Sequence, residues 1–163
     1  MAKDKTPVTS AIRQLRVAGV SFTDHLYEYE EKGGTAVSAR SLDVDEHSVV
    51  KTLIMEDDGK EPLVVLMHGD KQVSTKELAR VIGVKTISPC TPETAHRHTG
   101  YIVGGTSPFG TRKTLPVYME RTILELPRIY INGGKRGYLV GLDPQDAARL
   151  LRPVLVTVAT DKV

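Results

Sequence analysis

A lysine stands in the middle of an apolar run that is typical of a β-strand. The run is Val49-Val50-Lys51-Thr52-Leu53-Ile54, and strand alternation places Lys51 on the same face as Val49 and Leu53. A buried ammonium group is costly unless a partner or a ligand anion meets it. Lys51 is therefore a candidate for binding a negatively charged substrate. The alternative is an edge strand whose lysine extends its amine to solvent.

A glycine-rich segment, residues 100–110, combines a glycine pair with hydroxyl side chains. Adjacent glycines allow a ligand to approach the main chain, and they can direct N–H groups at an ester or phosphate oxygen. The alternative is a tight turn stopped by proline. The segment is not a P-loop, because the sequence lacks the Gly-x-x-x-x-Gly-Lys-Ser/Thr pattern. The candidate binding residues here are Gly104, Gly105, Thr106, Ser107 and Pro108.

A second glycine-rich segment, residues 133–137, carries two cations. Lys135 and Arg136 on a glycine-rich hairpin tip suit contacts to phosphate groups. A solvated hairpin turn is the equally simple alternative.

The residue types of metal centres and nucleophilic triads are sparse. His96 and His98 are two residues apart, so on a helix they face different directions and do not indicate a metal pair. The other histidines are isolated in the sequence, and no Gly-x-Ser-x-Gly elbow is present. Cys90 is the only cysteine, and a structural thiol is its simplest interpretation. We therefore expect no metal site.

The composition indicates one globular domain rather than a disordered or membrane-spanning chain. The 163 residues are 40% hydrophobic and 26% charged, with a net charge of +2, which is ordinary for a folded domain. A single cysteine fits a reducing compartment. Residues 1–7 do not resemble a signal peptide, so we expect a cytoplasmic protein without a membrane partner. Nucleic-acid binding would need a local basic patch.

Turn and capping residues divide the chain into helices and strands that do not alternate strictly. Asp58-Gly59 between two apolar runs predicts a hairpin, and Ser74-Thr75-Lys76-Glu77 predicts a helix start. The expected class is α+β: a mixed, mostly antiparallel, β-barrel-like sheet surrounded by helices, in a single domain over residues 1–163. The predicted helices cover residues 7–18 (with Thr6 as the cap), 36–42, 75–82, 92–99 and 144–151. The predicted strands cover residues 22–29, 48–55, 62–68, 84–88, 128–132, 138–142 and 153–158, with another short strand near residue 101.

Read in order, these segments resemble the YbaK/EbsC family of aminoacyl-tRNA deacylases, which are relatives of the editing domain of bacterial prolyl-tRNA synthetases. The resemblance rests on five segments: residues 6–11, His25-Leu26-Tyr27-Glu28, Val50-Lys51-Thr52-Leu53, residues 99–110 and residues 129–137. It implies hydrolysis of the ester that joins a wrong amino acid to tRNA, typically cysteine on the tRNA for proline. It also implies a protein without a metal or organic cofactor.

The resemblance implies roles for particular residues. Lys51 corresponds to the family's essential lysine, which anchors the 3′ end of the tRNA. Gly104 and Gly105 correspond to a loop beside the ester carbonyl, and Tyr27 corresponds to a strand tyrosine. The resemblance to cysteine-specific members also implies that the substrate's own thiol attacks the carbonyl, so that the protein mainly orients the substrate and stabilises charge.

One position departs from the family pattern and leaves three functions open. Some cysteine-deacylating relatives carry an Asp where this chain has Leu139. The favoured function is deacylation of Cys-tRNA(Pro). The alternatives are deacylation of Ala-tRNA(Pro) or another small aminoacyl-tRNA, and a non-catalytic module that binds tRNA or a synthetase. A domain of this size has little surface for reading distant tRNA features, so we expect help from a transient complex with prolyl-tRNA synthetase.

Overall fold

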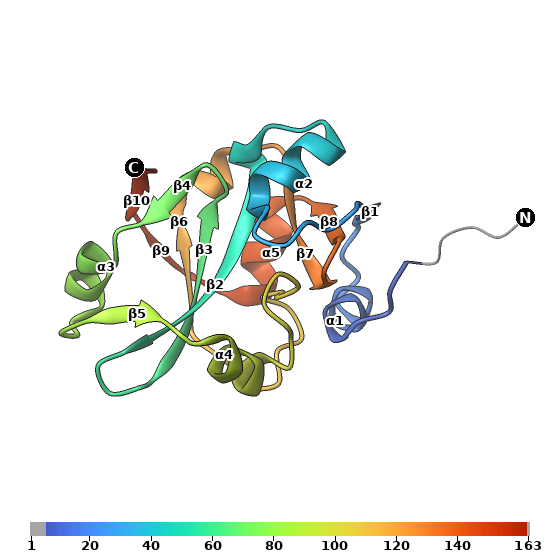
Figure 1. The fold of residues 1–163 in the computed structure, drawn as a ribbon. Helices are drawn as coiled ribbons and strands as arrows, with labels where there is room; N and C mark the ends of the chain where they lie inside the picture. The colour runs from blue at the N-terminus through green and yellow to red at the C-terminus, as the bar shows by residue number, and fades with distance from the viewer. Residues whose placement is uncertain (1–5, 163) are drawn as a thin grey trace, which may run out of the picture.

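The helices and strands follow one another irregularly along the chain, as the turn residues predict. The computed structural model describes residues 6–162, shown in Figure 1. The helices are α1 (Ser10–Val17), α2 (Gly34–Leu42), α3 (Thr75–Ile82), α4 (Pro92–Thr99) and α5 (Pro144–Leu151), with 3-10 turns η1 (Glu46–Ser48) and η2 (Arg121–Glu125). The strands are β1 (Thr23–Leu26), β2 (Val49–Asp57), β3 (Pro62–His68), β4 (Lys71–Val73), β5 (Ile87–Pro89), β6 (Val117–Glu120), β7 (Ile129–Lys135), β8 (Tyr138–Leu142), β9 (Val154–Val156) and β10 (Ala159–Asp161).

Eight strands form one mixed sheet, which confirms the predicted α+β class. Its order is β1-β8-β7-β2-β3-β6-β9, and β5 pairs with the far end of β2. Four of its pairings are antiparallel, and three (β2 with β7, β3 with β6 and β6 with β9) are parallel. Within residues 6–162 the hydrogen-bonded path has two open ends, β1 and β9, so it does not close into a ring. Strands β4 and β10 form a separate antiparallel pair.

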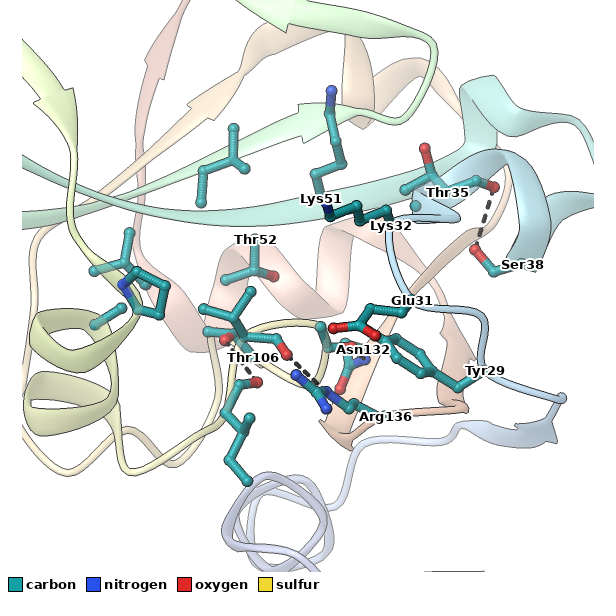
Figure 2. A pocket seen from close by; sticks show the side chains of 18 of the residues that line it. Tyr29, Glu31, Lys32, Thr35, Ser38, Lys51, Thr52, Thr106, Asn132 and Arg136 are labelled. Carbon is teal, nitrogen blue, oxygen red and sulfur yellow. Dashed lines mark hydrogen bonds between the residues drawn. The ribbon is translucent and has the colours of Figure 1, made fainter.

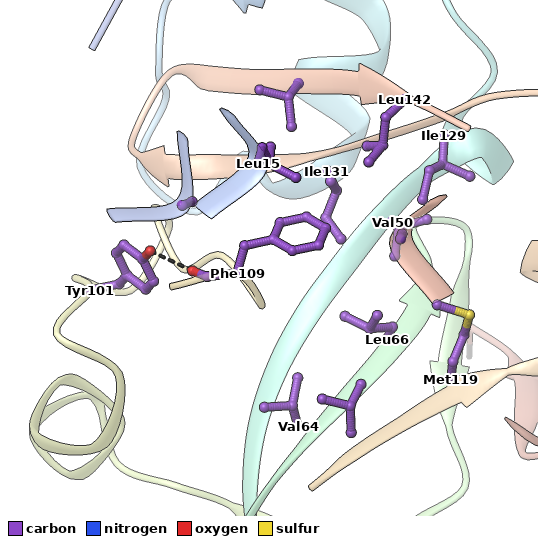
Figure 3. Packing of buried hydrophobic residues seen from close by; sticks show 14 of the residues in the cluster. Leu15, Val50, Val64, Leu66, Tyr101, Phe109, Met119, Ile129, Ile131 and Leu142 are labelled. Carbon is purple, nitrogen blue, oxygen red and sulfur yellow. Dashed lines mark hydrogen bonds between the residues drawn. The ribbon is translucent and has the colours of Figure 1, made fainter. Parts of the chain in front are cut away.

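The sheet is buried on both faces, and alternate residues of β2 serve different clusters. Val50 and Ile54 belong to the main core with α1 and α5, shown in Figure 3. On the opposite face, Val49 packs in a cluster with α2, and Met55 packs in a cluster with α3. Lys51 shares this second face and lies between the two clusters along the strand. Its predicted face is therefore confirmed.

Local capping explains most helix boundaries. Ser74 accepts a hydrogen bond from the Glu77 N–H at 3.2 Å, and Gly83 ends α3 in a left-handed conformation, as the sequence predicts. The start of α1 is a correction: the cap is Thr9 rather than Thr6. Thr9 Oγ1 accepts from the Ile12 N–H at 3.1 Å and also donates to the Gly133 carbonyl at 2.5 Å. A contact from a distant strand thus favours the later cap.

The remaining differences concern short strands. The predicted strand over 22–29 forms only over Thr23–Leu26, and β5 begins later than predicted. Strands β4, β6 and β10 are not predicted from the sequence. The predicted short strand near residue 101 is absent, because residues 101–110 form turns and bends. Short strands form because segments distant in the sequence pair with them, and local sequence patterns do not reveal these partners.

No helix in the described part of the chain has the length and apolarity needed to cross a membrane. Most of the N-terminal segment on which the signal-peptide prediction rests, residues 1–5, lies outside the described residues.

Candidate active site

A cavity of about 800 Å³ opens where β2 lacks a neighbouring strand. On this edge, β2 pairs with β7 only through Val49 and Val50, and with β5 only from Met55 onward. Between these points the strand edge forms a wall of the cavity. The other walls come from residues 27–38 around the start of α2, from 89–96 around the start of α4, from the glycine loop 102–106, and from Asn132, Arg136 and Leu139.

Lys51 lies on the cavity wall, half-buried, with its amine turned away from the glycine loop. Figure 2 shows its side chain and that of Thr52 leaving β2 in opposite directions. The Lys51 Nζ donates a hydrogen bond to the Lys71 carbonyl oxygen. Burial lowers the pKa of Lys51 below its ordinary value, and the positive charge of Lys162 adds to this effect. Glu46 and Asp70 oppose it, so the amine has acidic neighbours but no direct carboxylate partner within the described residues.

The two adjacent glycines have different roles: Gly104 lines the cavity, and Gly105 packs against another main-chain segment. Gly104 lines the cavity with a φ of +91°, and a Cβ there would lie 2.5 Å from the Tyr29 hydroxyl oxygen. Its carbonyl oxygen accepts a hydrogen bond from Asn132 Nδ2 at 3.1 Å. The Gly105 N–H donates to the Ile102 carbonyl oxygen at 2.8 Å, so it closes a turn. A Cβ on Gly105 would lie 2.6 Å from the Arg136 backbone nitrogen. Gly105 therefore lets the loop pack directly against the β7–β8 hairpin.

Arg136 joins the glycine loop, the hairpin and the segment before α2. Its Nε donates to the Val103 carbonyl oxygen at 2.8 Å, as drawn in Figure 2. Its guanidinium carbon lies 5.0 Å from the centre of the Tyr29 ring, a cation–π geometry. The remaining N–H donors can meet an anion at the cavity wall.

The predicted loop residues separate into two groups. Thr106 lines the cavity, and its Oγ1 donates to the Ile102 carbonyl oxygen at 3.4 Å. Ser107 is fully buried, and its Oγ accepts a hydrogen bond from the Phe109 N–H at 3.1 Å. Gly105, Ser107, Pro108 and Lys135 are not among the residues that line the cavity. As direct substrate contacts they stay predictions.

Two further positions from the sequence analysis reach the cavity. Tyr27 lines it beside α2, and burial raises the pKa of its hydroxyl. Leu139 lines it as well, 4% exposed, and packs with Val49 and Ala39. Leu139 thus belongs to an apolar wall of the cavity.

Several lining residues are missed by the sequence analysis. Thr52 lies next to Lys51 in the sequence, and its position on the apolar face with Val50 and Ile54 could have indicated it. Asn132 precedes the glycine pair of β7. Its Nδ2 donates to the Gly104 carbonyl oxygen, and its Oδ1 accepts a hydrogen bond from the Gly134 N–H at 2.7 Å. No local pattern indicates the others. They include Tyr29, Thr35, Ser38 and His96.

His47, His68 and Asp70 come together in the fold. His47 and His68 stack with ring centres 3.7 Å apart, and His47 Nδ1 lies 2.8 Å from Asp70 Oδ1. Their ligand atoms are close enough to hold a metal ion. Both ring nitrogens of His68 are hydrogen-bonded, to the His47 carbonyl and to Thr122 Oγ1, each at 2.7 Å. These bonds occupy the His68 nitrogen lone pair that a metal would need.

Comparisons with known proteins identify the family. Residues 30–150 match the family model of the aminoacyl-tRNA editing domain. The chain is 31% identical over 147 residues to the Enterococcus faecalis protein named "Putative Cys-tRNA(Pro)/Cys-tRNA(Cys) deacylase EbsC", covering 89% of this chain and 90% of that one. It is 30% identical over 128 residues to a proline–tRNA ligase of Streptococcus equi subsp. zooepidemicus, covering 77% of this chain but 21% of the ligase.

The fold is shared with a solved structure. This chain superposes on a solved structure described as "Crystal structure of a putative trans-editing enzyme for prolyl tRNA synthetase". The TM-score is 0.82 at 20% sequence identity, and the superposition covers 95% of this chain and 99% of that one. The family match spans most of the sheet and every wall of the cavity from residue 30 onward. The chain therefore belongs to the aminoacyl-tRNA editing domain family.

Proposed function

We propose that this protein removes a wrongly attached amino acid from tRNA, with Cys-tRNA(Pro) as the favoured substrate. The observation that carries the proposal is the cavity at the gap in the sheet, where Lys51, Gly104 and Arg136 line the walls. Lys51 and Arg136 supply positive charge for the 3′ end of a tRNA, while Leu139 and its neighbours supply an apolar wall for a small side chain. The EbsC relative, named as a Cys-tRNA deacylase, supports the same activity.

The lining residues favour attack by the substrate or by water over attack by a protein nucleophile. Burial, strengthened by the nearby Glu56 carboxylate, raises the pKa of the Cys90 thiol to about 11, which leaves little thiolate at neutral pH. Within residues 6–162, no hydroxyl that lines the cavity is hydrogen-bonded to a histidine ring. A serine or threonine nucleophile would need such a base.

A cysteinyl ester contains its own nucleophile. Its sulfur attacks the ester carbonyl carbon to form a cyclic thioester, the carbon–oxygen bond to the ribose breaks, and the thiol proton passes to the ribose oxygen. The protein then has to hold the ester in position and stabilise the negative charge that develops on the carbonyl oxygen.

The test is deacylation of Cys-tRNA(Pro) and Ala-tRNA(Pro) by the wild type, by Lys51→Ala and by Lys60→Ala. Lys60 is an exposed hairpin lysine that does not line the cavity, so its variant is the matched control. We expect Lys51→Ala to lower kcat/KM by roughly 100-fold or more, because it removes a charge held in the site, while circular dichroism stays unchanged. Full activity in a folded Lys51→Ala variant would refute the assignment.

Leu139 favours a second candidate, deacylation of Ala-tRNA(Pro). An apolar wall discriminates between two small side chains by only about 1–3 kcal/mol. Cleavage of the alanyl ester with the cysteinyl ester spared would establish this candidate and exclude the thiol mechanism. Tight, salt-sensitive tRNA binding without turnover of any aminoacyl-tRNA would indicate a binding module instead.

We also propose that the protein acts in the cytoplasm in a transient complex with prolyl-tRNA synthetase. The support is the presence of a related domain within proline–tRNA ligases. Deacylation of several cysteinylated tRNAs, with and without the synthetase, tests this. Strict tRNA selectivity by the isolated protein would contradict it.

A further inference from the structure

Thr52 lies at the gap in the sheet, between the residues of β2 that pair with β7 and those that pair with β5. Main-chain groups of successive strand residues point alternately to the two neighbours of a strand. The Val49 carbonyl oxygen accepts from the Gly69 N–H at 2.6 Å on the β3 side, and the Ile54 carbonyl oxygen accepts from the Cys90 N–H at 3.0 Å on the β5 side. Thr52, two residues before Ile54, therefore directs its N–H and C=O to the open side.

Among residues 6–162, no strand pairs with that side of β2 opposite Thr52. The pairing of β2 with β7 ends at Val50, and the next main-chain hydrogen bond on this side of β2 is the one from the Cys90 N–H to the Ile54 carbonyl oxygen. Four residue steps of a strand span about 13 Å. This length admits a group the size of one amino acid with an attached ribose. Thr52 is among the residues that line the cavity, which opens at this gap.

The Thr52 side chain adds a third polar group. Its Oγ1 is buried and has no hydrogen-bond partner in the part of the chain that the structure describes. Figure 2 shows the side chain pointing from β2 towards Thr106 and Arg136, opposite to Lys51. Buried polar groups are nearly always paired in native proteins, and an unpaired hydroxyl destabilises the fold. The unpaired hydroxyl and the main-chain N–H and C=O directed to the open strand edge belong to one residue beside a cavity, and together they indicate a ligand that pairs with them.

We propose that Thr52 binds the aminoacyl group of the substrate as a one-residue β-bridge. This rests on the proposed function and names the atoms that hold the substrate. In such a bridge the α-amino group donates to the Thr52 carbonyl oxygen, and the ester carbonyl oxygen accepts from the Thr52 N–H, as two opposed strand residues do. The same N–H then stabilises the negative charge that develops on that oxygen during cleavage. Residues directly opposite in a bridge share a face, so the substrate side chain lies beside the Thr52 hydroxyl.

The bridge requires an α-amino group, and stable amide analogues test this without catalysis. The probes are 3′-deoxyadenosine carrying either an alanylamino or a propionylamino group at the 3′ position; the second lacks only the α-amino group. We expect the alanyl probe to bind roughly 10-fold or more tightly than the propionyl probe, since a hydrogen bond to a charged donor is lost. Equal affinities would overturn the proposal.

Amide exchange at Thr52 gives a second, site-specific readout. In the free protein we expect the Thr52 N–H to exchange faster than the Leu53 N–H, which faces the paired β3 side and serves as the internal control. Saturation with the alanyl probe should slow exchange at Thr52 and shift its amide resonance, while Leu53 changes little. An unchanged Thr52 amide in the saturated protein would overturn the proposal.

The hydroxyl is tested separately by two variants. Thr52→Val keeps the shape of the side chain and removes the oxygen, while Thr52→Ser keeps the oxygen. The ligand here is 3′-deoxyadenosine carrying a cysteinylamino group at the 3′ position. We expect Thr52→Val to bind it a few-fold to 10-fold more weakly at an equal or higher melting temperature, and Thr52→Ser to retain binding. Equal binding by Thr52→Val would overturn the role of the hydroxyl. These binding results are independent of turnover: a protein that deacylates aminoacyl-tRNA but binds both probes equally retains its proposed function and loses the bridge.

Discussion

Replacing Gly105 with alanine tests whether the glycine loop is built on the β7–β8 hairpin. The new Cβ would lie 2.6 Å from the Arg136 backbone nitrogen and 2.8 Å from the Lys135 carbonyl carbon. Both neighbours are main-chain atoms, so neither can rotate away as a side chain would. The loop and the hairpin must therefore separate until these contacts reach about 3.4 Å, the start of ordinary van der Waals contact.

The expected loss of stability follows from the contacts that this separation strains. Overpacking of this kind costs about 1–3 kcal/mol. The hydrogen bonds from Arg136 Nε to the Val103 oxygen and from Asn132 Nδ2 to the Gly104 oxygen span the same joint. Weakening them adds roughly 1 kcal/mol, while the lower entropy of the unfolded alanine chain offsets about 0.4–1 kcal/mol. A net cost of about 1–3.6 kcal/mol lowers the melting temperature of a domain of this size by roughly 2–14 °C.

Thermal unfolding of Gly105→Ala is compared with that of Gly59→Ala. The control glycine lies in the β2–β3 turn, where a Cβ would approach only the Asp57 side-chain oxygen, at 3.3 Å. We also expect Gly105→Ala to lower kcat/KM for deacylation, because the loop moves relative to Arg136. A Gly105→Ala variant with the same melting temperature as the Gly59→Ala control would refute the packing argument.

Two further substitutions test the electrostatics of buried positions. Burial lowers the pKa of His68, which is 1% exposed, so below about pH 6.5 the unfolded chain binds a proton that the folded chain does not. The free energy of unfolding should therefore fall with decreasing pH, by at most about 1.4 kcal/mol per pH unit from this group. Urea unfolding between pH 5 and 7.5 should show a shallower slope for His68→Gln, and an unchanged slope would show that His68 does not contribute. Leu139→Asp places a carboxyl group in the apolar wall shared with Val49, which raises the pKa of that carboxyl. Its melting temperature should fall by more at pH 7 than at pH 5, where the carboxyl is more often neutral; an equal fall at both pH values would contradict this.

Much of the secondary structure is set by residues close together in the sequence. The Asp58-Gly59 turn predicts the β2–β3 hairpin, and Ser74 and Gly83 bound α3 through hydrogen bonds and a backbone conformation that involve only adjacent turns. Thr9 is different, because its hydroxyl also reaches the Gly133 carbonyl. A cap that is shared with a distant strand cannot be located from the helix sequence alone.

In the candidate site, too, some features follow from residues close together in the sequence and others from distant contacts. Alternation along 49–54 predicts the face of Lys51, and the glycines of residues 100–110 predict a loop that a ligand or another main-chain segment can approach. The sequence does not show that Gly104 faces the cavity while Gly105 faces the hairpin, because that depends on the position of the Arg136 backbone.

The sequence by itself thus determined the α+β class, most helix boundaries and the family resemblance, since these rest on local periodicity, capping and motif order. Only the tertiary structure decided which groups remain free to bind a ligand. The gap beside Thr52 exists because β7 and β5 pair with different ends of β2. An unpaired main-chain group is defined by the absence of a distant partner, and strand pairing between segments far apart in the chain is what the local sequence does not encode.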